Sequence, residues 1–180
     1  MGERLNTARA EMRRLDGIVY NFLRFSRPPA LNLQRIGAND LLAHIVALVE
    51  PEARERQIAL KLELADDLPL IMADDNLLSQ AILNIIINAF QAVGKEPAVL
   101  LGTHLDADSG HVQFRVVDNG SGIAAADLER VFEYYYTTKD TGTGLGLSIT
   151  QRIVHQHQGL IDVESAVGSG TVVTISLPPG

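Results

Sequence analysis

Five short boxes rich in Gly, Asn or Thr follow one another in the second half of this chain, and together they limit the folds it can adopt. In chain order they are residues 84–89 (NIIINA), 118–122 (DNGSG), 131–139 (VFE to TTK), 142–147 (GTGLGL) and 168–171 (GSGT). Gly and Asn mark turns and element ends, whereas the segments between the boxes carry apolar residues at helix or strand spacing. Each box alone is weak evidence. The ordered set predicts a mixed α and β domain with one polar pocket.

The composition is that of a soluble globular protein. The chain has 180 residues, enough for one domain and an extra element, and its hydrophobic fraction of 46% and charged fraction of 21% are ordinary. It has no Cys, which excludes a disulfide framework and a thiolate metal site. Asn84 and Asn88 interrupt the most apolar stretch, so no membrane span is predicted, and no signal-peptide pattern opens the sequence.

The net charge of −7 is distributed unevenly. Residues 1–27 carry six Arg and three acidic residues, a balance of +3, so the remainder carries −10. An acidic main domain repels phosphate backbones, which argues against nucleic acid as its partner.

Residues 3–26 have the pattern of one amphipathic helix. Apolar residues recur at alternating steps of three and four: Leu5, Ala8, Met12, Leu15, Val19 and Phe22. Ile18 and Phe25 widen this stripe toward four-helix packing, so the helix is a candidate for homodimer formation. The alternative is a helix folded back on its own domain. Pro28 and Pro29 end it. The predicted divisions are a helical segment (1–27), a linker (28–38) and the main domain (39–180).

The main domain alternates helix and strand patterns. Helices are predicted over residues 39–56, with Asn39 as a candidate cap, 74–93, with Asp74 or Asp75 as the cap, 124–132 and 145–157. Strands are predicted over 58–64, 70–72, 99–103, 112–117, 161–164 and 171–177. This order predicts an α+β sandwich, with a mixed, mostly antiparallel sheet covered by helices on one face.

Asn84 and Asn88 lie four residues apart, so both project from one face of the predicted helix. A buried amide without a partner costs about 1–3 kcal/mol, and an amide oxygen suits Mg²⁺, which is usually shared with substrate phosphates. Gln91 continues this face. Alternatively, both Asn side chains bridge neighbouring backbone.

Asp118 ends a predicted strand and precedes Gly120 and Gly122. A carboxylate there is able to accept a hydrogen bond from an exocyclic amine, while the glycines let backbone approach a flat ring. Taken alone, the same residues favour an ordinary turn.

The box at residues 142–147 opens a helix, and a helix N-terminus favours anions. It is not a Walker loop, because no Gly-Lys-Ser/Thr follows, and its spacing departs from the dinucleotide fingerprint. Gly168, Ser169 and Gly170 alone indicate a hairpin turn.

In order and spacing, these boxes resemble those of the histidine kinase branch of the ATPases that also include DNA gyrase, Hsp90 and MutL. The resemblance covers roughly residues 39–177. The segments at residues 14–16 and 25–28 resemble the second dimerisation helix and linker of nitrogen-regulator-type sensor kinases, which extends it to almost the whole chain.

The resemblance implies a pocket for ATP and Mg²⁺ and transfer of the γ-phosphoryl group to a histidine. Asn88 would bind Mg²⁺ with a contribution from Asn84, and Asp118 would bind the adenine amine. Residues 124–143 would form a lid, anchored by Phe132 and closed by Lys139. Asn84, Asn88 and Lys139 are the implied catalytic residues. The implied ATP-binding set further contains Gln91, Gly120, Gly122, Ile123, Thr138, Gly142, Thr143, Gly144, Leu145, Gly146, Leu147 and Thr171.

The chain departs from the family pattern in its lid and its histidines. Tyr134, Tyr135 and Tyr136 replace the usual Pro-Phe-Phe, and each hydroxyl needs a partner. At Gln91 many relatives carry Lys or His, although Gln also occurs in the nitrogen-regulator subgroup. None of the histidines lies in an acceptor context: His44, His104, His111, His155 and His157.

We therefore expect a chain that does not phosphorylate itself, with the acceptor histidine on a helix of the parent kinase. The expected partners are that helix and a response regulator, in the cytoplasm, whether or not the parent is membrane-anchored. Two alternatives are a nucleotide-dependent interaction module without phosphotransfer and an anti-sigma-type serine kinase.

Overall fold

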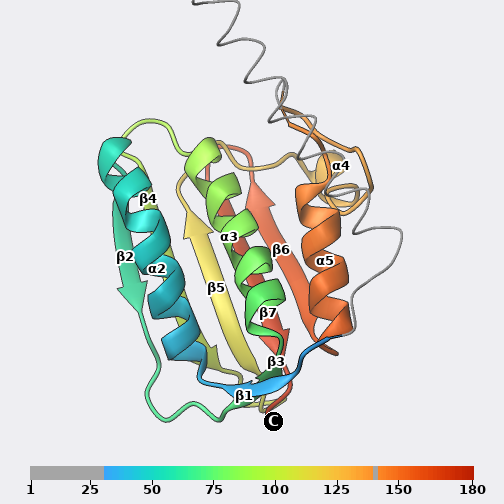
Figure 1. The fold of residues 1–180 in the computed structure, drawn as a ribbon. Helices are drawn as coiled ribbons and strands as arrows, with labels where there is room; N and C mark the ends of the chain where they lie inside the picture. Colours follow the sequence, from blue (N-terminus) through green and yellow to red (C-terminus); the bar gives the residue numbers. More distant parts are fainter. Residues whose placement is uncertain (1–30, 140–141) are drawn as a thin grey trace, which may run out of the picture. The chain divides into compact units, whose positions relative to one another are not determined.

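A five-stranded β-sheet with three helices over one face makes up most of the described structure (Figure 1). The computed structural model describes residues 31–139 and 142–180. The predicted helix at 3–26 and its self-association lie outside the described residues, as do residues 28–30 of the predicted linker. Residues from Asn32 to Gly180 form one compact unit.

The main sheet has the strand order β2–β4–β5–β7–β6. Its strands are β2 (Ala59–Glu63), β4 (Ala98–Leu105), β5 (Val112–Asp118), β7 (Gly170–Leu177) and β6 (Leu160–Ala166). β2 runs parallel to β4, and every other neighbouring pair in this sheet is antiparallel. The predicted mixed, mostly antiparallel sheet is confirmed.

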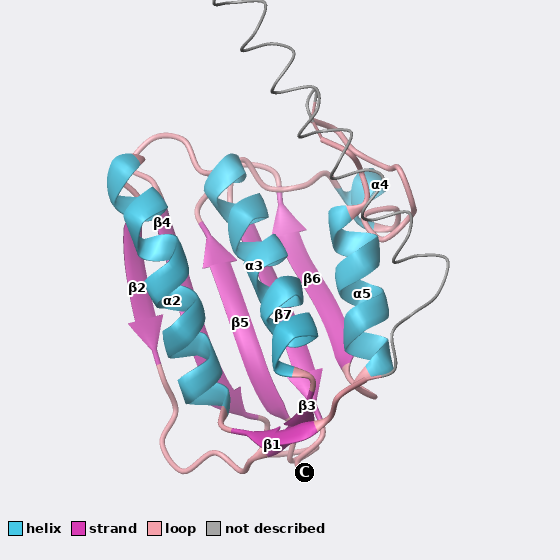
Figure 2. Ribbon diagram, in the orientation of Figure 1, coloured by secondary structure: helices cyan, strands magenta, loops and turns pink. Residues whose placement is uncertain are grey.

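Three helices cover the same face of this sheet: α2 (Ala38–Glu55), α3 (Asp75–Ala92) and α5 (Gly146–Gln156) (Figure 2). α3 lies between the other two and is apolar around most of its circumference, so Leu78, Ile82 and Ile86 are fully buried. A buried aliphatic side chain of this size contributes about 1.5–3 kcal/mol, which makes α3 the centre of the core.

Two predicted helix boundaries were wrong. α2 begins at Ala38 after Gly37, and the Asn39 side chain instead donates to the Ala65 carbonyl (2.9 Å) and accepts from the Thr103 hydroxyl (2.6 Å). The helix predicted over 124–132 is only the single turn α4 (Ala125–Leu128). The residues that follow it form turns closed by local backbone hydrogen bonds.

A second, small sheet lies at the opposite end of the unit from the ends of β5 and α3. It pairs β1 (Gln34–Ile36) with β3 (Ile71–Ala73), antiparallel. β1 falls inside the predicted linker. The sequence analysis missed it because a three-residue strand is too short to show the alternation of buried and exposed residues. None of the helices in the described ranges has the length and apolar character needed to cross a bilayer.

The first turn of α3 is held by a polar network that joins it to the end of α5. Asp74 caps the helix as predicted, accepting from the backbone N–H of Leu77 (3.1 Å) and of Asn32 (3.0 Å). The Asp74 N–H donates to Nε2 of buried His157 (2.9 Å), whose Nδ1 lies 2.8 Å from the Ile153 carbonyl. Since an N–H only donates and a carbonyl only accepts, these contacts place a ring proton on Nδ1 and leave Nε2 as the acceptor.

We predict that His157→Leu lowers the free energy of unfolding by about 1–3 kcal/mol, because it leaves the buried Asp74 N–H without a partner. Urea denaturation monitored by circular dichroism measures this. The exposed His155 on the same helix supplies the control, His155→Leu. Equal losses in the two variants would contradict the structural role assigned to His157.

Candidate functional site

The predicted boxes gather at the end of the sheet where β5 and β6 terminate and α5 begins (Figure 1). The Gly168 N–H donates to the Ser121 carbonyl (2.7 Å), which joins the β6–β7 turn to the box after β5. The Ser121 N–H in turn donates to the Ala92 carbonyl at the end of α3 (3.2 Å). Segments as far apart in sequence as Ala92 and Gly168 thus form one continuous backbone platform.

Asp118 is the buried carboxylate of this platform, 7% exposed. Its Oδ1 accepts from the Gly120 N–H (2.8 Å), and the Thr171 N–H of the neighbouring strand also donates to it. Burial raises the pKa of Asp118, although these two N–H groups and the charge of Lys139 favour the carboxylate. The side chain is therefore a desolvated acceptor held in one orientation.

Two glycines of the predicted base pocket are required by close packing of backbone. A Cβ on Gly120 would lie 2.6 Å from the Ala92 carbonyl, so this residue seats the loop on the end of α3. Gly122 has a positive φ of 67°, and a Cβ there would overlap the Ala166 carbonyl of β6. These two residues let the loop after β5 pack closely against the end of α3 and the end of β6.

The two Asn residues of α3 differ in their surroundings. The Asn84 amide donates to the Thr150 hydroxyl (2.9 Å) on α5, and a Cβ on Gly146 would lie 2.7 Å from its oxygen, so Asn84 packs the two helices together. Asn88 is half-buried, and within the described ranges none of its neighbours hydrogen-bonds to its side chain. The bridging alternative therefore fits Asn84, whereas the Asn88 amide is open to a ligand.

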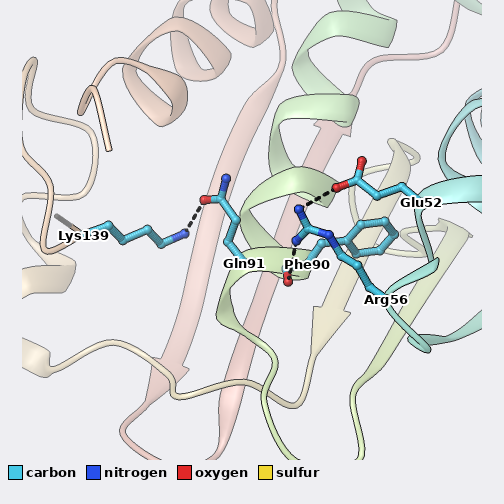
Figure 3. Close-up of polar contacts among 5 residues, drawn as sticks. All are labelled: Glu52, Arg56, Phe90, Gln91 and Lys139. Atoms are coloured by element: carbon cyan, nitrogen blue, oxygen red, sulfur yellow. Dashed lines mark hydrogen bonds and ion pairs between the residues drawn. The ribbon is translucent and has the colours of Figure 1, made fainter. Parts of the chain in front are cut away.

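Lys139 reaches from the predicted lid to the last turns of α3 (Figure 3). Its ammonium donates to Oε1 of Gln91 (3.0 Å) and approaches the Asn88 carbonyl (3.5 Å). The residue is exposed overall, but desolvation of the ammonium lowers the pKa of Lys139, partly offset by the nearby Asp118 carboxylate. A cation whose direct contacts are neutral acceptors, on the same side as Asp118 and Asn88, is well placed for an anionic ligand.

Two residues of the Tyr-rich segment in the predicted lid, Tyr135 and Tyr136, make hydrogen bonds to other parts of the chain. The Tyr136 hydroxyl donates to the Asp127 carboxylate, which raises the pKa of Tyr136, and Arg130 lies 4.1 Å from the centre of its ring. Tyr135 has a positive φ of 65°, and its N–H donates to the Gly144 carbonyl (2.9 Å). The predicted lid is therefore joined to the glycine box before α5.

The remaining predicted ligand residues differ in how far their side chains are exposed to solvent. Thr138 and Thr143 are exposed, and Phe132, Gly142 and Leu145 are half-buried. Leu147 packs against the hydrophobic core, which makes it a less suitable ligand residue than its position in the box indicated.

A cleft of about 760 Å³ adjoins the site on the side of α2. Gln91 and Lys139 form one wall, and Arg56 forms part of the other, pairing with Glu52 (2.9 Å) and donating to the Phe90 carbonyl (3.4 Å) (Figure 3). The α3 helix has no basic residue in its last turn, so Arg56 supplies the cation that its C-terminus favours. The sequence patterns did not predict this cleft.

Ser165 of β6 is a residue of the site that the sequence analysis missed. Its hydroxyl accepts from the Ile123 N–H (2.9 Å) and donates to the Gly170 carbonyl (2.7 Å). The predicted strand stopped one residue short of it. Extending the hairpin pairing back from Thr171 would have identified it as a cross-strand neighbour.

Comparisons with known proteins agree on one family. Residues 73–180 match the family described as histidine kinase-, DNA gyrase B- and HSP90-like ATPase. The sensor histidine kinase ZraS of Escherichia coli (strain K12) is 41% identical over 168 residues, which are 93% of this chain and 36% of ZraS. The chain thus spans little more than a third of the length of that relative.

Solved structures of histidine kinases share the fold. Full-length ShkA in complex with AMPPNP superposes with a TM-score of 0.85 at 29% identity, covering 98% of this chain and 38% of ShkA. Histidine kinase ThkA in complex with the response regulator protein TrrA gives a TM-score of 0.82 at 26% identity, covering 99% of this chain and 51% of ThkA.

We predict that Asp118→Asn raises the free energy of unfolding at pH 7 by on the order of 1 kcal/mol, because the amide avoids the desolvation of a buried carboxylate. The folded-state pKa of Asp118 lies above its unfolded value of 3.8, so the carboxylate disfavours folding at neutral pH and this cost disappears as the pH falls toward 3.8. The advantage of the variant should shrink over the same range, measured by urea denaturation at several pH values.

Asp106 provides the opposite control. It lies in an exposed turn, where the Ser109 hydroxyl lowers the pKa of its carboxyl. Asp106→Asn should give no stabilisation at pH 7, and a gain equal to that of Asp118→Asn would contradict the role of burial.

Proposed function

This chain belongs to the histidine kinase-, DNA gyrase B- and HSP90-like ATPase family, and we propose that it binds Mg·ATP and donates the γ-phosphoryl group to a histidine of a two-component sensor kinase. The observation that carries this proposal is the buried Asp118 carboxylate, oriented by the N–H groups of Gly120 and Thr171 at the end of β5. A fixed, desolvated acceptor of this kind recognises an amine donor and repels a carbonyl oxygen. In this reading the donor is the exocyclic amine of adenine.

The triphosphate would extend from this base pocket between α3 and the start of α5. The N–H groups of the first turn of α5 attract anions, and residues 142–146 bring backbone close to it. Lys139 would exchange its contact with Gln91 for a phosphate oxygen. Since its ammonium is partly desolvated, an anionic partner would restore the pKa that burial lowers.

Asn88 fits the ligand chemistry of Mg²⁺. Its half-buried amide supplies a hard neutral oxygen, and it lies one turn before Gln91 on the side of α3 that Lys139 reaches. When bound there, Mg²⁺ would neutralise phosphate charge. We propose that Asn84 acts differently from its predicted role as a ligand, by holding the start of α5 in place through Thr150.

In the reaction, the bond from the γ-phosphorus to its bridging oxygen breaks and a bond to an imidazole nitrogen forms, with the imidazole proton released. Positioning and charge neutralisation supply most of the acceleration in such transfers. We propose that the acceptor histidine lies on another helix of the parent kinase, because none of the His residues in this chain has the acceptor context. A response regulator would then receive the phosphoryl group, as ThkA binds TrrA in its complex.

We predict that Asn88→Ala weakens ATP binding in the presence of Mg²⁺ by at least about tenfold, the effect of 1.4 kcal/mol, without changing stability by more than about 0.5 kcal/mol. Asn84→Ala should instead lower the free energy of unfolding by about 1–2 kcal/mol, because it breaks the contact to Thr150. Calorimetric titration with ATP, with and without Mg²⁺, and urea denaturation measure the two effects. Loss of metal-dependent binding in Asn84→Ala alone would reverse the assignment.

Transfer itself is tested with radiolabelled ATP and candidate acceptor proteins. A label that is lost in acid identifies phosphohistidine, whereas an acid-stable label would favour the serine kinase alternative. Tight, metal-dependent ATP binding without transfer to any histidine acceptor would favour the interaction module.

A further inference from the structure

Three polar side chains lie in one row across three strands at the site. Asp118 of β5 pairs in register with Thr171 of β7, and Thr171 pairs in register with Ser165 of β6. Asp118 and Thr171 are both buried, on the face of the sheet covered by helices. The sequence patterns indicated only the first two of these residues as part of the site.

The hydrogen bonds around Ser165 determine the direction of every bond in this row. Its Oγ lies 2.7 Å from the Gly170 carbonyl, 2.9 Å from the Ile123 nitrogen and 3.0 Å from Oγ1 of Thr171. A carbonyl only accepts and an N–H only donates, so the single Ser165 proton goes to Gly170 and its oxygen accepts from Ile123. The remaining contact then requires Thr171 to donate its own proton to Ser165.

The Thr171 hydroxyl is left with lone pairs alone. Beside it stands the Asp118 carboxylate, which accepts from the Thr171 and Gly120 N–H groups and offers further lone pairs. The row therefore presents acceptors and no free hydroxyl donor to a ligand. An acceptor atom of a ligand placed against these buried acceptors would be repelled and left without a hydrogen bond. The row therefore selects for ligands that present a donor there.

We propose that Ser165 is a specificity-determining positioning residue, which orients the Thr171 hydroxyl as an acceptor so that the pocket takes 6-amino purine nucleotides and rejects 6-oxo ones. This inference rests on the proposed nucleotide site. An exocyclic amine carries two protons, one for each of two acceptors, whereas a keto oxygen at the same place offers none. Ser165 acts on the ligand only through Thr171 and the Ile123 backbone.

The test is the ratio of the dissociation constants of inosine triphosphate and ATP, each measured with Mg²⁺ by calorimetric titration. Inosine triphosphate carries a keto oxygen in place of the amine and a proton on the neighbouring ring nitrogen. Ser165→Ala frees the Thr171 proton to point toward the ligand, so this ratio should fall by about tenfold relative to wild type. Loss of stability alone would weaken both nucleotides equally and leave the ratio unchanged.

Three further variants make the outcome decisive. Ser165→Thr keeps the hydroxyl and should retain the wild-type ratio, and Thr171→Val removes the acceptor and should lower the ratio even if Ser165→Ala fails to fold. Ser169→Ala, an exposed Ser in the same hairpin, is the matched control and should change nothing. A wild-type ratio in both Ser165→Ala and Thr171→Val, with ATP still bound, overturns the inference alone. A folded wild type that binds neither nucleotide overturns the proposed function as well.

Discussion

Burial of helix α3 is the constraint on which the rest of this structure depends. The helix packs against the sheet and lies between α2 and α5, so the polar groups that it buries need partners from distant parts of the chain. Asn84 is satisfied by Thr150 of α5, and the last carbonyls contact Ser121 and Arg56. Each of these contacts also positions a wall of the site, so core packing and site geometry are one arrangement.

The platform at the end of α3 combines features that oppose each other energetically. Burial raises the pKa of Asp118, which costs stability at neutral pH, while the N–H groups of Gly120 and Thr171 favour its charged form. The result is an acceptor that is oriented before any ligand arrives. Lys139 is the complementary case, a desolvated cation whose direct contacts are neutral oxygens. A hydrogen-bond donor would stabilise the Asp118 carboxylate, and an anion would stabilise the Lys139 ammonium. The desolvation of both groups is therefore offset in the proposed complex with ATP.

The lid illustrates how a departure from a family pattern is accommodated. A Tyr in place of an apolar residue brings a hydroxyl that needs a partner, and Tyr136 finds Asp127 nine positions earlier, with Arg130 over its ring. Tyr135 adopts a left-handed conformation that L-residues disfavour, and its N–H contacts the Gly144 carbonyl. The Tyr136 side chain thus joins the predicted lid to α4, and the Tyr135 backbone joins it to the glycine box that precedes α5.

The sequence by itself determined the order of helices and strands, the mixed sheet with helices on one face, the Asp74 cap and the family, because periodicity, capping residues and box spacing are local properties. It did not reveal β1, which is too short for a period, nor the true start of α2. Only the tertiary structure decided that Asn84 bridges two helices while Asn88 stays open, that buried His157 links the start of α3 to the end of α5, and that Ser165 lies in register with Thr171. These roles depend on which side chains meet across separations such as the 66 residues between Asn84 and Thr150, and such meetings are set by packing of the whole core.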